Sequence, residues 1–459
     1  MEDIERKSWI SFAKKLIGTI QTTFPYADIL YSHVREKRII KDTKEVTVDD
    51  SDDKGVKIRI WDGKAFNEFC TSFLDKEYLE EQVHTLMSSI KRRGKTIPRD
   101  VKKLNKRFAT KPKKDPRVMP LSTKIKKLSS IHTKLVKDDD IAHARVALIE
   151  EWEEKIFVSE HRALSQELTN ETLITLTYVQ TEQGLEQHYQ SFFSHGIEHL
   201  DLAQSTIREI IKKSKQLKKA KKLTPGKYTC VLSPHLSGLL AHESFGHGME
   251  ADTMLKGMCL AKDYLGQKIA GTQVNIVENP SLQGCHGSYF FDDEGELASK
   301  TYLMKKGVVH TPISDIYSAH YLRTPKTANG RCERFDHKIY ARMSNTYFEP
   351  GKDDPKKLIK SVKDGLYLHS AGGGMEDPKG WGIQIQGILA ERIQNGKLTG
   401  ELFTNITMTG YLPTILNNIK MIANDLEVNG TGRCGKQHKE WVRVSEGGPH
   451  MLIEEVELG

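Results

Sequence analysis

The segment Ala241–Asp252 carries residue types that could hold a metal ion and act on water. It contains His242, Glu243 and His247 in the pattern H-E-x-x-x-H. In the shorter pattern H-E-x-x-H, two histidines four residues apart lie on the same side of a helix and share a metal. Here the spacing is five, which corresponds to about 140° around a regular helix. A regular helix would therefore point the two imidazoles to different sides.

An extra residue in the helix would restore the geometry. Such a π-bulge occurs mainly at functional sites, and Gly246 and Gly248 beside the second histidine would ease the distortion. The spacing thus leaves two interpretations open. Either the segment forms a metal site on a distorted helix, or two unrelated histidines end a buried helix.

A hydrolytic zinc site needs a third protein ligand and an open position for water. Cys434 lies in the glycine-rich segment Asn429–Gly435, where the backbone could approach a metal closely. Cys285 and Cys332 are alternatives on composition alone. For each of the three, a free thiol is the competing interpretation.

Three other acidic or glycine-rich segments have residue types that could form a site. Glu250 and Asp252 could orient a ligand histidine through its second nitrogen, or could simply be a charged helix end. The run Asp292–Gly295 lacks the spacing of a calcium loop, so we expect a turn whose carboxylates accept backbone hydrogen bonds. Gly372–Gly374 lacks the Lys-Ser and the helix of a phosphate-binding loop.

The first half of the chain predicts a sheet covered by helices. Alternating residues predict strands between Asp28 and Ile60, broken by an acidic turn at Asp49–Asp53. A following helix has one apolar stripe, and such a helix needs a sheet to cover. That stripe consists of Leu79, Val83, Leu86, Met87 and Ile90. We expect an N-terminal α/β domain at residues 1–222.

The second half predicts mostly strands. A short strand at Cys230–Leu232 precedes the apolar helix that carries His242, and Asn395-Gly396 predicts a type I′ hairpin turn. A late helix is expected from Pro413, with its apolar side running to Ile422 and Ala423. We therefore expect an α+β protein whose β-rich C-terminal domain, residues 223–459, carries the H-E-x-x-x-H helix.

Charge is concentrated in one part of the chain. Of the formal net charge of +8, the segment Lys91–Lys137 contributes +16, from 18 Lys or Arg and two Asp. With four prolines and few large apolar residues, it predicts an exposed, Lys-rich insertion with helical pieces. Nucleic-acid binding is the alternative, but Phe108 is its single aromatic for base stacking. A second basic stretch, Arg208–Lys222, predicts an amphipathic surface helix.

Composition bounds the class of protein. With 37% hydrophobic and 28% charged residues, the 459-residue chain has a globular composition and no apolar run of membrane-spanning length. Its six cysteines form no C-x-x-C pair, and the first residues do not resemble a secretory signal. These features predict a cytoplasmic protein without a disulfide framework.

Five segments of the second half together resemble the TldD/PmbA family of metallopeptidases. They are HESFGHGMEAD, FDDEGE, ARMSNTYFEPG, HSAGGGMED and NGTGRCGK, at residues 242–252, 291–296, 341–351, 369–377 and 429–436. The first half resembles the family more loosely, through DKGVKIRIWDGKAF at residues 53–66. The Lys-rich segment matches no motif of the family.

The resemblance implies a zinc ion held by His242, His247 and Cys434. It implies hydrolysis of small or unfolded peptides inside a dimer chamber, with Glu243 as general base on a zinc-bound water. The family pairs a zinc-bearing TldD-type subunit with a zinc-free PmbA or TldE type, and this chain resembles the TldD type. A homodimer or a heterodimer with such a paralogue is therefore expected. The alternative is a nucleic-acid-associated or topoisomerase-modulating protein that uses residues 91–137.

Overall fold

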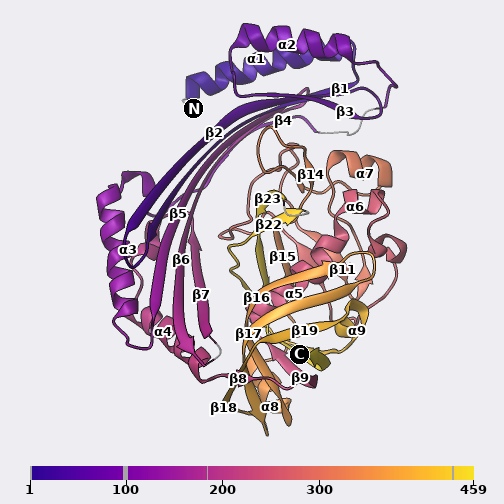
Figure 1. Cartoon of the computed structure of the whole chain (residues 1–459). Coiled ribbons are helices and arrows are strands. Elements are labelled where there is room, and N and C mark those ends of the chain that lie inside the picture. The colour runs from indigo at the N-terminus through magenta and orange to yellow at the C-terminus, as the bar shows by residue number, and fades with distance from the viewer. Residues whose placement is uncertain (1–2, 97–101, 183, 437–438) are drawn as a thin grey trace.

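A computed structural model describes residues 3–96, 102–182, 184–436 and 439–459. Figure 1 shows a long curved sheet, formed by the N-terminal half, wrapped around a compact C-terminal half. This α+β architecture confirms the predicted fold class. Among the described residues, no helix is long and apolar enough to span a membrane.

The N-terminal sheet has seven strands in the order β3-β2-β1-β5-β6-β4, and β7 also pairs with β6. All of its pairings are antiparallel except that of β4 with β6. The strands are β1 (Tyr26–Lys41), β2 (Val46–Trp61), β3 (Phe66–Thr71), β4 (Leu104–Ala109), β5 (His143–Ser159), β6 (Arg162–Thr181) and β7 (Gly184–Ser194).

Helices cover the convex face of this sheet at its two ends (Figure 1). They are α1 (Asp3–Gln21), α2 (Lys76–Ser89), α3 (Leu121–Val136) and α4 (Gln204–Lys219), with short 3₁₀ turns η1 (Pro116–Val118) and η2 (Ile197–Leu200). The stripe expected on α2 is confirmed, since Leu79 and Val83 are buried in the core under α1. Helix α4 confirms the amphipathic helix, with Ile207, Ile210 and Leu217 buried.

The acidic turn expected at Asp49–Asp53 is wrong. These residues lie inside β2, and the chain turns earlier, between β1 and β2. Their carboxylates are tolerated because cations on β1 lie opposite them. Asp50 pairs with Lys37 at 3.2 Å, and Asp52 pairs with Arg35 at 3.2 Å.

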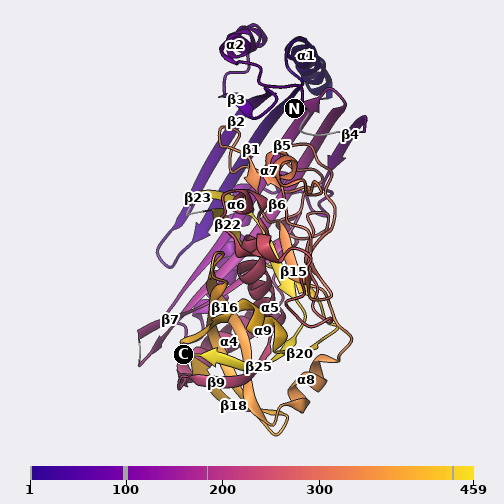
Figure 2. The ribbon, with the colours of Figure 1, turned by 90° about the vertical axis from the view of Figure 1, so that its right-hand side faces the viewer.

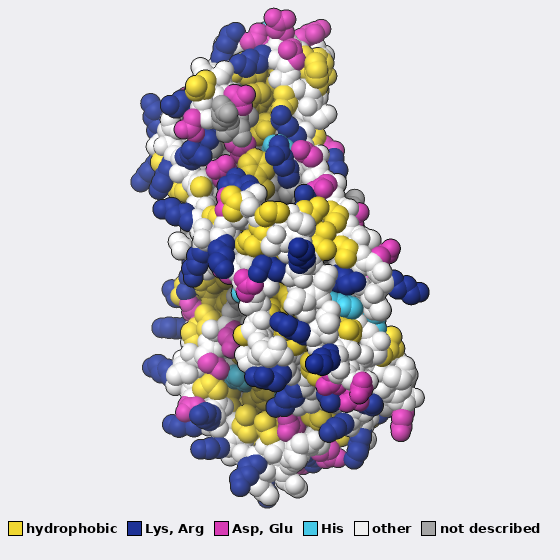
Figure 3. Space-filling model, turned by 90° about the vertical axis from the view of Figure 1, so that its left-hand side faces the viewer, with side chains coloured by type: hydrophobic (Ala, Val, Ile, Leu, Met, Phe, Trp, Pro, Cys, Tyr) yellow, Lys and Arg dark blue, Asp and Glu magenta, His cyan; other side chains and the backbone are white. Residues whose placement is uncertain are grey.

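The Lys-rich segment Lys91–Lys137 also differs from an exposed connection. It supplies the edge strand β4 and the helix α3, while residues 97–101 lie outside the described part. Helix α3 buries Leu128, Ile131 and Leu135 against the sheet, and most of its lysines point away. Lys and Arg side chains are spread over this outer side of the molecule rather than gathered in one patch (Figure 3).

The C-terminal half contains two main sheets, and Figure 2 shows this half from a second side. In the larger sheet, β16, β9, β25, β19 and β17 pair in that order and β17 pairs again with β16, so the five strands close into a barrel. These strands are β16 (Asp364–Asp377), β9 (Gly226–Leu232), β25 (Met451–Leu458), β19 (Ile406–Tyr411) and β17 (Gly382–Gln394), with β18 (Lys397–Thr404), β8 (Lys221–Lys222) and β20 (Ile419–Ile422) attached.

The second sheet has the order β12-β11-β10-β15-β24-β21. Its strands are β10 (Ile276–Glu278), β11 (Thr301–Lys305), β12 (Val308–Val309), β15 (Asn345–Phe348), β21 (Glu427–Val428) and β24 (Ser445–Gly448). Two small hairpins are β13 (Gly330–Arg331) with β14 (Tyr340–Ala341), and β22 (Arg433–Lys436) with β23 (Lys439–Arg443). The helices are α5 (Pro234–Ala241), α6 (Ala251–Leu255), α7 (Ile316–Leu322), α8 (Pro355–Ser361) and α9 (Leu412–Asn417), with 3₁₀ turns η4 (His247–Met249) and η5 (Leu260–Tyr264).

Local predictions in this half had mixed outcomes. The type I′ turn is confirmed, because Asn395 and Gly396 between β17 and β18 have φ of 49° and 73°. The late helix is shorter than expected. It ends at Asn417, and Ile419–Ile422 forms β20 against β25, since those isoleucines are buried by strand pairing.

Buried ion pairs join the two halves. Arg59 of β2 donates to both oxygens of Asp28 at 2.8 and 2.7 Å and to Glu294 at 2.6 Å. Lys155 of β5 pairs with Asp293 at 2.6 Å. The C-terminal half therefore lies against the concave face of the sheet. The division near residue 222 stays a prediction, since β8 just before it pairs with β18.

Candidate metal centre

The three residues expected to hold a metal come together in space. One ligand atom from each of His242, His247 and Cys434 lies within 4.8 Å of the other two. The Cys434 Sγ is 3.3 Å from His247 Nε2, and the two imidazoles lie nearly perpendicular with centroids 5.2 Å apart. Two nitrogens and one sulfur at this separation form the donor set of a zinc site with an open position.

A π-helical turn brings the two histidines to one side. Helix α5 is regular from Pro234 to Ala241, and a π-helical turn, η3, follows over His242–Gly246. Because a π-helix repeats from residue i to i+5, it places residues five apart in register. Of the two interpretations left open by the spacing, the π-bulge is the one present, and Met343 packs closely on it: a Cβ on Gly246 would lie 2.1 Å from Met343 Sδ.

Cys434 reaches the histidines on the hairpin β22–β23, where it lies opposite Val442. Two carboxylates of the N-terminal sheet hold this hairpin. Arg433 beside the cysteine donates to Glu36 at 2.7 Å and to Glu151 at 2.6 Å. The concave face of the sheet thus helps to position the third ligand.

A layer of buried charges surrounds the three ligands. Glu250 lies 3.7 Å from His247 Nδ1, so one of the two carboxylates expected to orient a ligand histidine does face it. Asp252 pairs instead with Lys436 at 2.6 Å. Arg342, fully buried, donates to Glu250 at 3.2 Å and to Cys434 Sγ at 3.2 Å.

Electrostatics favour the ionised thiolate. Burial alone would raise the pKa of Cys434, but the charges of His247 and His242 outweigh it and hold that pKa well below its usual value. Burial opposes a charge on His242, yet the Cys434 charge outweighs it and raises the pKa of His242 to about 9. His242 Nδ1 is buried and makes no hydrogen bond to a described residue. In the metal-free protein the thiolate is therefore paired with protonated imidazole, and a metal ion would have to displace those protons to use the nitrogens as ligands.

Glu243 lies beside these ligands and is only partly buried. Burial raises the pKa of its carboxyl group, although both histidines oppose that effect. Strand β16 packs directly against it, because a Cβ on Gly374 would lie 2.7 Å from Glu243 Cγ. The glycine run at 372–374 therefore lets backbone approach the carboxylate.

The remaining candidates lie elsewhere. The Cys285 thiol donates to the Val428 carbonyl oxygen at 3.5 Å, and the Cys332 thiol to Asp293 at 3.4 Å. Asp292 confirms the expected turn, because its carboxylate accepts the backbone N–H groups of Glu294, Glu296 and Gly330 at 2.8–3.0 Å.

Comparison with known proteins identifies the family. Residues 225–459, half of the chain, match the profile of the PmbA/TldA metallopeptidase C-terminal domain. The chain belongs to the TldD/PmbA family of metallopeptidases. A metalloprotease of Methanocaldococcus jannaschii is 27% identical, over 92% of this chain and 94% of that relative. A zinc metalloprotease TldD homologue of Saccharolobus solfataricus is 31% identical, and the match spans about half of each chain.

Solved structures share the fold of this TldD/PmbA family member. A Thermotoga maritima protein described as a proposed modulator of DNA gyrase has a TM-score of 0.79 and 18% identity, with 98% of this chain and 99% of that chain covered. TldE from Thermococcus kodakarensis has a TM-score of 0.77 and 15% identity, with 98% and 100% covered. At these identities the likeness shows the fold alone.

Three residues near the candidate ligands of this TldD/PmbA chain were not predicted from the sequence. Lys436 could have been found, because alternation along β22 puts it on the same face as Cys434. Arg342 lies in a family segment, but spacing gave it no role. Glu376 lies two residues after Gly374 on β16, and neither of its buried carboxylate oxygens accepts a hydrogen bond from a described residue. Burial raises the pKa of Glu376 to about 8.

Proposed function

We propose that this chain is a zinc metallopeptidase that hydrolyses small or unfolded peptides, with His242, His247 and Cys434 as the zinc ligands. The observation that carries the proposal is the convergence of these three side chains beside Glu243 on a π-helical turn. When bound, zinc supplies Lewis-acid polarisation of a carbonyl group and lowers the pKa of a water. Two imidazoles and a thiolate suit zinc better than magnesium or calcium.

The chain's own residues perform the proton transfers. In the proposed reaction, the Glu243 carboxylate accepts a proton from the attacking water and later donates it to the nitrogen of the leaving amine. Glu250 holds the His247 imidazole through Nδ1, and Arg342 holds both Glu250 and Cys434. These contacts fix the ligands before a metal arrives.

A free strand edge supports peptide binding beside Glu243. Between Ser370 and Asp377, β16 pairs with β17 on one side, and no described strand pairs with its other edge. An extended peptide could add there as a strand, bound through backbone hydrogen bonds and therefore with little dependence on side chains. We propose this edge as the substrate track, since Gly374 on it contacts Glu243.

The proposed active form is a dimer that encloses this site in a chamber. The partner is a second copy or a zinc-free PmbA/TldE-type paralogue. Cytoplasmic location stays part of this proposal. Nucleic-acid binding gains no support, because the one aromatic of the Lys-rich segment, Phe108, stacks on Phe290 at 5.1 Å.

The test is a Glu243→Gln variant assayed on an unfolded peptide, with and without the candidate partner. We expect a fall of about 10²- to 10⁴-fold in hydrolysis with metal content and fold retained, because the residue acts on protons and not as a ligand. The matched control is Glu160→Gln, an exposed carboxylate at the turn between β5 and β6. Hydrolysis by Glu243→Gln at the wild-type rate would refute the proposed role.

A further inference from the structure

The convex face of the N-terminal sheet changes character between its covering helices. Under α1 the face carries apolar residues such as Ile29 and Ile58, and under α3 it carries Ile39 and Leu148. Between them, three successive rows across β2, β1, β5 and β6 are polar. In the order β2, β1, β5, β6, the first row consists of Lys54, His33, Glu154 and Glu167. The second consists of Asp52, Arg35, Trp152 and Thr169, and the third of Asp50, Lys37, Glu150 and Glu171.

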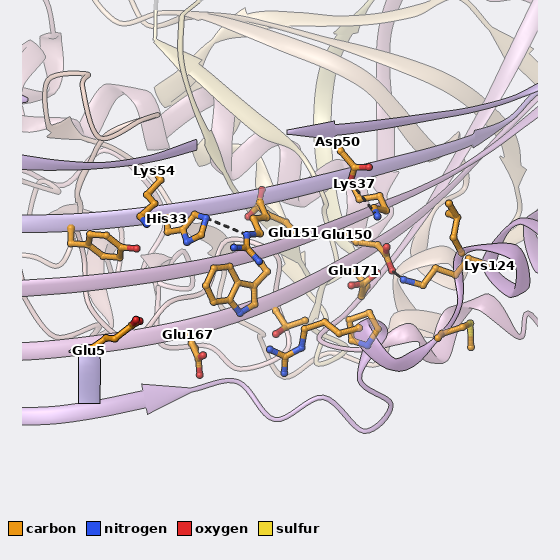
Figure 4. A pocket seen from close by; sticks show the side chains of 18 residues that line it. Glu5, His33, Lys37, Asp50, Lys54, Lys124, Glu150, Glu151, Glu167 and Glu171 are labelled. Atoms are coloured by element: carbon orange, nitrogen blue, oxygen red, sulfur yellow. Dashed lines mark hydrogen bonds and ion pairs between the residues drawn. The ribbon is translucent and has the colours of Figure 1, made fainter. Parts of the chain in front are cut away.

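A cavity of about 750 Å³ lies over these rows (Figure 4). Its walls come from α1, through Glu5, and from η1 and α3, through Pro116, Arg117 and Leu121. It lies on the face of the sheet that α1 and α3 cover, because residues of both helices form part of its walls. A volume of this size suits a small molecule.

Most charges that line the cavity are already paired. Lys37 pairs with Asp50 at 3.2 Å and Arg35 with Asp52 at 3.2 Å. Arg117 pairs with Asp115 at 2.7 Å just before η1. The one cation of α3 at this end, Lys124, forms an ion pair with Glu150 (Figure 4).

Glu171 is the exception. It is 97% buried, lines the cavity, and neither of its oxygens accepts a hydrogen bond from a described residue. Its direct cross-strand neighbour is another carboxylate, Glu150. Like charges opposite each other destabilise a sheet, and an unpaired buried carboxylate costs more still. Lys124 is the cation that acts on Glu171, but it is paired with Glu150, so the two carboxyl groups share it.

We propose that this cavity binds a small organic cation, whose ammonium or guanidinium group lies between the carboxyl groups of Glu171 and Glu150. Such a group donates several hydrogen bonds and can satisfy both carboxylates at once. The apolar side chains of Pro116, Met119 and Leu121 in the cavity wall give an adjoining methylene chain a surface to cover.

Without a bound cation, the repulsion between Glu171 and Glu150 is relieved by protonation of Glu171. Burial, followed by the charge of Glu150, raises the pKa of Glu171 to about 10, so its carboxyl group keeps a proton at neutral pH. Lys124 from α3 and Asp115 before η1 are the other charged groups that act on it. An arriving cation favours the carboxylate, so binding releases this proton.

Isothermal titration calorimetry on the full chain at pH 7 tests the proposal with three probes: spermidine, agmatine and Nα-acetyl-lysine amide, whose side-chain ammonium group is free. We expect saturable binding of at least one probe, with proton release seen as a difference between two buffers of unlike ionisation enthalpy. Tighter binding of spermidine or agmatine identifies a free amine as the ligand. Tighter binding of Nα-acetyl-lysine amide than of spermidine and agmatine identifies the ligand as a basic side chain of a peptide.

The deciding variant is Glu171→Gln, which keeps the side-chain shape and should weaken binding at least about tenfold. Glu150→Gln should weaken it as well and serves if the first variant folds poorly. The matched control is Glu209→Gln, an exposed carboxylate on α4 that pairs with Lys213 at 3.2 Å and does not line the cavity; it should leave binding within about twofold. Absence of saturable binding of all three probes, or equal binding by wild type and Glu171→Gln, overturns the proposal.

Discussion

Arg342 links the third candidate metal ligand to a buried carboxylate, so one residue should contribute strongly to the stability of this site. Its guanidinium is fully buried and contacts both Cys434 Sγ and Glu250. Removing one partner of a buried ion pair leaves the other charge uncompensated. We predict that Arg342→Met lowers the free energy of unfolding by about 3–5 kcal/mol.

Chemical denaturation of the metal-free protein measures this effect. The control is Arg392→Met, whose ion pair with Asp364 at 2.6 Å is partly exposed, with 30% of the Arg392 side chain and 57% of the Asp364 side chain open to solvent. That variant should lose no more than about 1 kcal/mol. If both variants lose the same free energy of unfolding, the buried contacts of Arg342 stabilise the protein no more than a surface ion pair does.

Single residues also mark the limit of the sequence argument. The H-E-x-x-x-H spacing made a shared metal site depend on a π-bulge without deciding whether one forms, and the structure has one over His242–Gly246. Spacing could not choose between Cys434, Cys285 and Cys332, because that choice depends on strand pairings that bring residue 434 next to residue 247. The family resemblance pointed to Cys434.

At the scale of elements, β16 is the strand that packs against the π-helical turn carrying Glu243. A methyl group on Gly374 would lie 2.7 Å from Glu243 Cγ, so Gly374→Ala must displace the carboxylate or the strand. We predict a loss of peptide hydrolysis of at least about tenfold with zinc content unchanged, since a small misplacement of a proton-transfer group is costly.

Gly382→Ala in the neighbouring strand β17 is the control for this prediction. A Cβ there meets no atom within 4 Å, and its φ is not positive. Activity and folding should therefore stay close to wild type. If both variants hydrolyse peptides equally well, β16 does not constrain Glu243.

The elements predicted correctly are those whose structure is decided by residues within the element itself. Helix α2 and the β17–β18 turn followed from their own residues. The acidic run in β2 and the end of α9 did not, because cross-strand partners far along the chain decide them: Asp50 needs Lys37, and Ile419 needs Ile453. Tertiary contacts thus overrode local signals.

At the scale of the whole molecule, buried neutral histidines should make stability depend on pH. Burial lowers the pKa of His188 in the N-terminal half, and that of His286 in the C-terminal half, to about 4. The unfolded chain, with a histidine pKa of about 6.5, binds more protons between these values. Stability is therefore complete above about pH 6.5 and is lost as pH falls towards 4.

We predict that each histidine contributes up to about 3 kcal/mol to this loss. Urea unfolding from pH 7 to pH 4 should show a flatter profile for His188→Leu than for wild type. His161→Leu is the control, because that side chain is 47% exposed. Parallel profiles for wild type and His188→Leu would contradict the assignment.

The central claim is that His242, His247 and Cys434 form one zinc site, and metal analysis of the purified chain tests it most directly. We predict about one zinc per chain in the wild type and in a Cys285→Ala control, whose thiol contacts only the Val428 carbonyl among the hydrogen bonds described. We predict that zinc is lost in His247→Ala and in Cys434→Ala. Stoichiometric zinc that survives unchanged in both of these variants would contradict the account.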